Sequence, residues 1–210
     1  MGAQYKIDAK TVGLVVRGKK NDADSPGYMQ QHADCILPGG EPVGFYGGKG
    51  DASSGSSGGS PLGTIKSSDN GPSISLNSAG MNMRGMVAYY NDLLRIRPMY
   101  VDVRMAKTYK TVSTVLLLDV TKTQADLFSN YWKNLKLKPG AFNIVGWNCS
   151  THAAEAFKSA NIISSGIPGL DTPNNLYLYL KRLYAKKVRI YSGYIGAIHT
   201  TGNNYDLVVE

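Results

Sequence analysis

Apolar and polar residues alternate with the period of two that is typical of β-strands along much of the chain. Several of these stretches are rich in β-branched residues and end at clusters of Gly, Pro, Asn or Asp. Two of them flank the turn Pro38–Gly40, which predicts a hairpin with a short loop. The predicted strands are residues 5–17, 32–37, 41–46, 100–109, 111–120, 188–199 and 205–208.

The apolar spacing changes to three and four residues in other parts of the chain, which predicts helices. A first helix begins at Thr123 and ends before Pro139. A second begins at Asn148, because asparagine is a good N-cap, and it places Cys149 in its first turn on the core-facing side. A third is predicted over residues 176–184. The hydrophobic content of 42% and charged content of 18%, with 14 Tyr and 24 Gly, are typical of a globular protein rich in strands and turns, so the composition indicates an α+β protein.

The chain of 210 residues predicts a single domain over residues 1–210, large enough to bury a hydrophobic core without disulfides. Residues 47–60 (GGKGDASSGSSGGS) contain no apolar anchor and predict a flexible Gly/Ser loop. Such a loop is either a tolerated surface insertion or a rim beside a cleft.

The formal net charge of +8 favours an anionic partner, such as nucleic acid, an acidic membrane surface or a cell-wall polymer. The chain has no zinc-finger spacing and no long basic arm, which argues against a dedicated nucleic-acid binder. Its first ten residues lack an apolar h-region, and it has no run of about 18 apolar residues, so we expect neither Sec export nor a transmembrane segment. Three scattered histidines without an HExxH spacing argue against a metal, and no cofactor is expected.

Cys149 is the candidate nucleophile. The free N–H groups and the dipole at a helix start favour negative charge, which lowers the pKa of a thiol there. The alternative is that Cys149 is an inert packed residue, because free cysteine is among the most buried residue types. Cys35, whose side chain is expected on the strand face opposite His32 and Asp34, is interpreted as a core residue.

A cysteine nucleophile needs a base, and the chain offers only His32, His152 and His199. His152 follows Cys149 by three residues on the same helix, where it cannot easily face a substrate across the nucleophile, so a neighbouring or structural role is favoured. His199 lies in a late strand without a motif and is interpreted as a packed or surface residue. His32 begins a hairpin strand and precedes a small residue, which leaves its ring accessible. His32 is therefore the preferred base.

Two motifs around these residues resemble a known family. Residues 143–157 (NIVGWNCSTHAAEAF) resemble the Asn–Cys helix start of circularly permuted papain-like hydrolases related to the NlpC-type cell-wall peptidases. Residues 32–46 (HADCILPGGEPVGFY) are similar to their histidine-bearing hairpin, which precedes the cysteine helix in permuted members, and residues 171–176 (DTPNNL) resemble a segment that follows it. The resemblance implies a papain-like fold, with an antiparallel sheet packed against the cysteine-bearing helix and additional helices.

The family also implies a third polar residue that orients the histidine. Glu41, on the returning strand of the hairpin, is the first choice, and Asp34, on the same strand face as His32, is the second. Either carboxylate could instead be a solvated residue at a turn or sheet edge. The oxyanion hole is expected to use the backbone N–H of Cys149 and a donor near Asn148 or Trp147.

The function implied by this resemblance is cysteine-dependent hydrolysis of amide bonds in peptidoglycan stem peptides. Together with the missing signal peptide, it implies an antibacterial toxin that is made in the cytoplasm and delivered by type VI secretion to the periplasm of a target cell. A secretion carrier and an immunity protein are the implied protein partners. The alternatives are a lipid hydrolase or acyltransferase like the lecithin:retinol acyltransferase family, an isopeptidase acting on ubiquitin-like proteins, or a binding module in which Cys149 and His32 merely pack.

Overall fold

The computed structural model describes residues 2–26, 31–47, 66–68, 71–73, 83–142, 148–164 and 172–210. The strands are β1 (Ala3–Lys6), β2 (Thr11–Arg17), β3 (His32–Ile36), β4 (Pro42–Gly47), β5 (Lys66–Ser68), β6 (Gly71–Ser73), β7 (Met83–Tyr89), β8 (Val112–Asp119), β9 (Ala141–Phe142), β10 (Val188–His199) and β11 (Tyr205–Val209). The helices are α1 (Tyr90–Ile96), the 3-10 helix η3 (Pro98–Tyr100), α2 (Val103–Thr108), α3 (Lys122–Leu137), α4 (Cys149–Ser159) and α5 (Pro173–Leu183).

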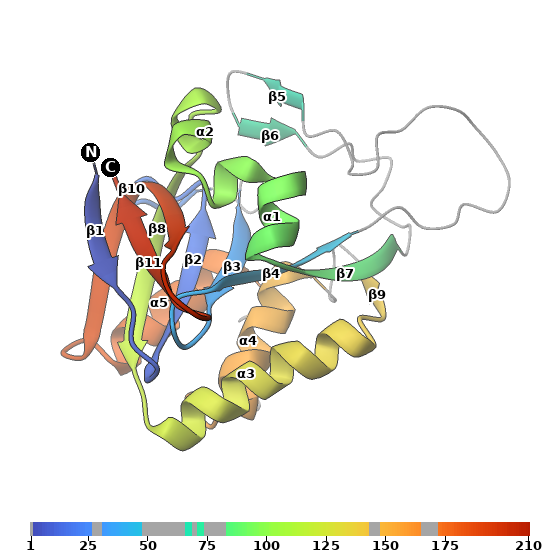
Figure 1. Cartoon of the computed structure of the whole chain (residues 1–210), viewed down its shortest axis with the longest axis vertical. Helices are drawn as coiled ribbons and strands as arrows, with labels where there is room; N and C mark the ends of the chain where they lie inside the picture. Colours follow the sequence, from blue (N-terminus) through green and yellow to red (C-terminus); the bar gives the residue numbers. More distant parts are fainter. Residues whose placement is uncertain are drawn as a thin grey trace, which may run out of the picture.

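An antiparallel sheet of nine strands, in the order β1-β11-β10-β8-β2-β3-β4-β7-β9, forms the centre of the described structure (Figure 1). Strands β5 and β6 pair only with each other. The two termini lie side by side because Ala3 in β1 pairs with Val209 in β11. This large sheet with its helices confirms the predicted α+β class.

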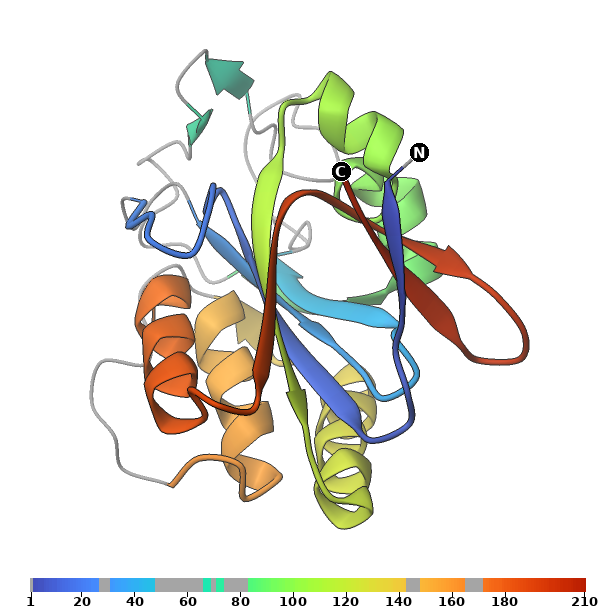
Figure 2. The same ribbon diagram turned by 90° about the vertical axis from the view of Figure 1, so that its left-hand side faces the viewer.

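Helices α3, α4 and α5 cover one face of the sheet, as Figure 2 shows from the side. Alternate residues of β2 explain this layering, because Leu14 packs into the cluster beneath these helices, whereas its neighbour Val15 faces a second cluster on the other side. Helix α1 and η3 pack on that second side, where Leu93 and Tyr100 contact Tyr46 of β4. Strand β3 is therefore covered on both faces.

Local sequence chemistry fixes the starts of the three long helices. Thr121 and Gln124 form a capping box at α3, and the Asn148 side chain accepts hydrogen bonds from the first-turn N–H groups of α4. Both helices begin within a residue of their predicted starts. Helix α5 begins three residues earlier than predicted, because Thr172 caps it and Pro173 occupies its first position, where proline is favoured.

Two strand predictions are wrong. Residues 5–17 form two strands rather than one, because the Asp8 carboxylate accepts a hydrogen bond from the Lys10 N–H and makes a turn between β1 and β2. Residues 100–109, predicted as a strand, form the end of η3 and helix α2. Asp102 caps α2 by accepting from the N–H groups of Arg104 and Met105, so a local cap overrides the alternating apolar pattern.

Two expectations lie at least partly outside the described residues. The predicted Gly/Ser loop starts at Gly47, the last residue of β4, and residues 48–60 are not described. Trp147, expected near an oxyanion hole, is likewise not described. In the part of the chain that is described, no helix combines the length and apolar character needed to cross a membrane.

Candidate active site

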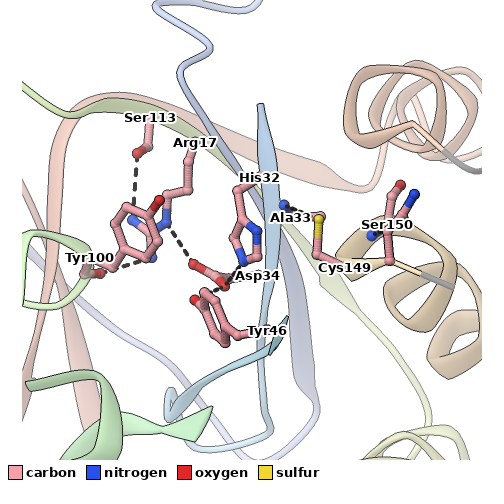
Figure 3. A network of polar contacts seen from close by, with 10 residues as sticks. Arg17, His32, Ala33, Asp34, Tyr46, Tyr100, Ser113, Cys149 and Ser150 are labelled. Carbon is pink, nitrogen blue, oxygen red and sulfur yellow. Dashed lines mark hydrogen bonds and ion pairs between the residues drawn. The ribbon is translucent and has the colours of Figure 1, made fainter. Parts of the chain in front are cut away.

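The start of α4 brings Cys149 against strand β3, which carries His32 and Asp34 (Figure 3). The backbone N–H of Ala33 donates a hydrogen bond to the Cys149 sulfur, with a nitrogen–sulfur distance of 3.4 Å. Asn148 caps the helix through its side-chain oxygen, 2.9 Å from the Ser150 nitrogen, and so fixes the backbone that presents Cys149. The thiol is thus held from both the helix and the strand.

The imidazole of His32 lies between the thiol and a carboxylate (Figure 3). Its Nε2 is 3.0 Å from Oδ1 of Asp34, and its side chain is also hydrogen-bonded to Cys149. Because Asp34 engages Nε2, Nδ1 is the ring nitrogen left for the sulfur. The His32 side chain retains 17% exposure, whereas that of Asp34 is fully buried. The order thiol, imidazole, carboxylate is that of a nucleophile, base and orienting residue.

Cys149, His32 and Asp34 form a row of three contacting side chains. The electrostatics of this row favour the charged forms of the thiol and the imidazole. Burial opposes the charged form of His32, but the negative charges of Cys149 and Asp34 outweigh it and raise the pKa of His32 to about 10. Burial also opposes ionisation of Cys149, yet the charge of His32, its hydrogen bond and the Ala33 N–H lower the pKa of the thiol. Both shifts favour a thiolate–imidazolium pair over the neutral pair.

Asp34 is ionised because charged and polar partners surround it. Burial alone would raise the pKa of Asp34, but the charges of His32 and Arg17 and the hydrogen bond from Tyr46 hold it well below its usual range. Arg17 Nε donates to Asp34 Oδ2 at 2.7 Å, and the Tyr46 hydroxyl donates to Oδ1. Arg17 in turn donates to the backbone oxygen of Tyr100 at 2.8 Å. The carboxylate is therefore fixed from three directions.

Two tyrosine rings and one glycine shape the space around this row. The ring of Tyr46 stacks on that of His32 with centroids 4.5 Å apart, and the ring of Tyr100 lies 5.8 Å from it. Gly44 pairs with Asp34 in the sheet, and a Cβ at Gly44 would lie 2.2 Å from Asp34 Oδ1. Only glycine leaves room for the carboxylate at that position.

Glu41, the first choice for the orienting residue, is not the carboxylate that contacts His32. Asp34, the second choice, makes the contact with His32. The register of the hairpin pairs Asp34 with Gly44, and continuing it places Tyr46, not Glu41, opposite His32. Glu41 lies at the turn end, where burial raises its pKa and the backbone of Tyr90 donates a hydrogen bond to it.

The remaining histidines lie outside the row. His152 is buried, its Nδ1 is 2.7 Å from the Tyr131 hydroxyl, and burial lowers its pKa to about 4, so it is neutral near pH 7. His199 is exposed, and its Nε2 is 2.7 Å from the backbone oxygen of Gly202. Cys35 is fully buried in the core under the helices, and burial raises its pKa. These three residues have the surroundings of packed or surface groups.

Sequence reasoning missed Arg17, Gly44, Tyr46 and Tyr100. One signal could have pointed to Arg17, since it is the only charged residue of the otherwise apolar or small strand β2 and is nevertheless buried. Asp34 interrupts β3 in the same way. Two opposite charges within neighbouring buried strands predict a pair, because an isolated buried charge is costly.

Among the described residues, no group of three or more His, Cys, Asp and Glu side chains is arranged to hold a metal ion. No family model, no curated protein and no solved structure matches the chain. The geometry of the site and the motif resemblance are therefore the support for a functional proposal.

Proposed function

We propose that the chain is a cysteine hydrolase in which Cys149 is the nucleophile, His32 the general acid and base, and Asp34 the residue that orients the imidazole. The observation that carries this proposal is the row in which a helix-start thiol, a half-buried imidazole and a buried carboxylate contact one another in that order. Two packed residues without a function would not need a carboxylate that is itself held by Arg17 and Tyr46.

The proposed reaction proceeds through a thioester. The Cys149 thiolate attacks the carbonyl carbon of an amide, and the carbonyl oxygen becomes an oxyanion beside the backbone N–H of Cys149. Protonated His32 gives its proton to the leaving nitrogen, so the C–N bond breaks and an amine departs. Neutral His32 then takes a proton from water, which attacks the thioester and releases a carboxylic acid and the Cys149 thiolate. Asp34 keeps the ring orientation through both steps.

The proposed substrate is the stem peptide of peptidoglycan. Its support is the resemblance to permuted NlpC-type hydrolases, together with a net charge of +8, which suits an anionic wall. On the same grounds the proposed biological role is that of an antibacterial toxin, delivered by a type VI secretion carrier to a target periplasm. The producing cell would then need an immunity protein that blocks this site.

Purified sacculi test the proposed reaction. The wild-type protein is expected to release new amino groups and soluble muropeptides, and Cys149→Ala is expected to release none above background. His32→Ala should lower the rate by about 10²- to 10⁴-fold, which is typical for loss of a general acid–base. His199→Ala is the matched control, because His199 lies outside the row, and it should leave the rate unchanged.

Two outcomes would overturn the proposal. Equal amine release by wild type and Cys149→Ala would exclude a cysteine mechanism. Release of fatty acid from phospholipid vesicles, with intact sacculi, would replace the wall amidase with a lipid hydrolase of the same fold.

A further inference from the structure

One cation next to the candidate site has no anionic partner among the residues that the structure describes. Arg97 connects α1 to η3, and its guanidinium carbon lies 5.2 Å from the centroid of the Tyr46 ring and 5.7 Å from that of the Tyr100 ring. Within the described part of the chain its side chain makes no ion pair or hydrogen bond, and its Nε is buried without an acceptor.

Other arginines of this region differ from Arg97 in this respect. Arg17, which also contacts the Tyr100 ring, is paired with Asp34. Arg95, two residues before Arg97, is 77% exposed and lies 4.0 Å from Asp92. A guanidinium offers several N–H donors in a planar fork that fits a carboxylate, and burial without an acceptor leaves this capacity unused. Arg97 is thus a preformed donor group without an acceptor among the described residues.

The position of Arg97 relates it to the chemistry. The Tyr46 ring contacts both the Arg97 guanidinium and the His32 ring. One aromatic ring therefore links the cation to the base. An extended peptide advances about 3.3–3.6 Å per residue. An extended segment of about three residues is therefore long enough to cover the distance between the His32 ring and Arg97, so a substrate group near the scissile amide can reach Arg97.

We propose that Arg97 is a specificity-determining residue that binds a free carboxylate of the substrate close to the scissile amide. This inference rests on the proposed function and narrows its substrate class, because stem peptides carry free carboxylates beside their amide bonds. The planar fork of Arg97 would bind such a group in a bidentate manner. The Tyr46 and Tyr100 rings hold the guanidinium in place before the substrate arrives.

The test uses one synthetic stem tetrapeptide in two forms, with its carboxylates free or converted to carboxamides. Binding of both forms is measured by calorimetry in a Cys149→Ala background, and turnover is measured with Cys149 intact. Arg97→Met is expected to weaken binding and kcat/KM for the acid form by about 10- to 150-fold, the range for a hydrogen bond to a charged group. The amide form should change less than about threefold, and Arg97→Lys should lie in between.

Arg95→Met is the matched control, because it removes a surface arginine from the last turn of α1, two residues before Arg97. It should leave the ratio between the two forms at the wild-type value. Equal losses on both forms, no loss on either, or no binding of the acid form to the Cys149→Ala protein would overturn the role of Arg97. A melting temperature of Arg97→Met well below that of Arg95→Met, with an unchanged ratio, would assign Arg97 to structure alone.

Failure of the proposed function gives a different result. If the acid form binds in an Arg97-dependent way but neither form is hydrolysed, the hydrolase proposal fails and the carboxylate site stands. If Arg97→Met instead lowers fatty-acid release from phosphatidylglycerol vesicles and leaves peptide binding unchanged, the bound group is a lipid phosphate and the carboxylate proposal is overturned.

Discussion

Replacing Asp34 with Asn tests the electrostatic logic of the site most directly. The substitution keeps the size of the side chain and removes the negative charge that lies 3.0 Å from His32 Nε2 and 2.7 Å from Arg17 Nε. The wild-type carboxylate contributes to a His32 pKa of about 10. Without it, the charged form of His32 loses one of its two anionic neighbours, so its pKa must fall.

The size of the fall follows from the contact that is lost. A hydrogen bond between charged groups contributes about 1.5–3 kcal/mol, and one pKa unit corresponds to about 1.4 kcal/mol. The His32 pKa is therefore expected to fall by about 1–2 units in Asp34→Asn. The same change leaves Arg17 without its anion, and loss of one partner of a buried ion pair costs about 3–5 kcal/mol of stability.

The assay is a pH titration of the His32 ring protons by NMR in the wild-type and Asp34→Asn proteins. Urea unfolding measures the accompanying loss of stability and defines the pH range in which the variant is folded. In an active preparation, the alkaline limb of the kcat/KM profile should shift to lower pH by the same number of units as the His32 pKa, because that limb reports the loss of the His32 proton. A His32 pKa that differs by less than about 0.3 units between the wild type and Asp34→Asn would show that the Asp34 charge does not control His32.

Three further predictions concern neighbouring residues. Gly44→Ala should displace the Asp34 carboxylate and lower the free energy of unfolding by about 1–3 kcal/mol through overpacking, measured by urea unfolding. Unchanged stability and activity would contradict the close approach of Gly44 to the Asp34 carboxylate. Iodoacetamide should modify Cys149 faster than Cys35, since the pKa of the first is lowered and that of the second raised. Mass spectrometry of digests measures both rates, and a Cys149 rate no higher than that of Cys35 would contradict the thiolate–imidazolium pair. His32 has a folded pKa above its unfolded value, so its stabilisation is complete below about pH 6.5 and is lost as the pH rises towards about 10; this loss of stability should disappear in His32→Gln.

Much of the fold was predictable because the signals are local. Asn148 and Thr121 cap helices by bonding to groups two or three residues away, and these caps are visible in the sequence. The segment 100–109 has an apolar alternation typical of a strand, but the Asp102 side chain caps a short helix there and decides the structure. Strand β7 and helix α1 were missed for want of a clear period.

The site was predictable only in part for a different reason. Cys149 and His32 emerged from helix position, a short list of histidines and a motif resemblance. The choice between Asp34 and Glu41 depended on hairpin register, which the turn around Gly39 and Gly40 decides and composition does not. The contact between Arg17 and the Tyr100 backbone joins distant segments, and no local pattern reveals it.

The contacts that hold Cys149 have a consequence for folding. The hydrogen bond from Ala33 to Cys149 spans 116 residues, and that from Arg17 to Tyr100 spans 83. Contacts of such long sequence separation require large loops to close, so they cannot form in an isolated fragment that lacks one of the two segments. The surroundings that lower the pKa of Cys149 therefore depend on the assembled sheet, and the alkylation rate of Cys149 is expected to report on the assembly of the β3–α4 contact during refolding.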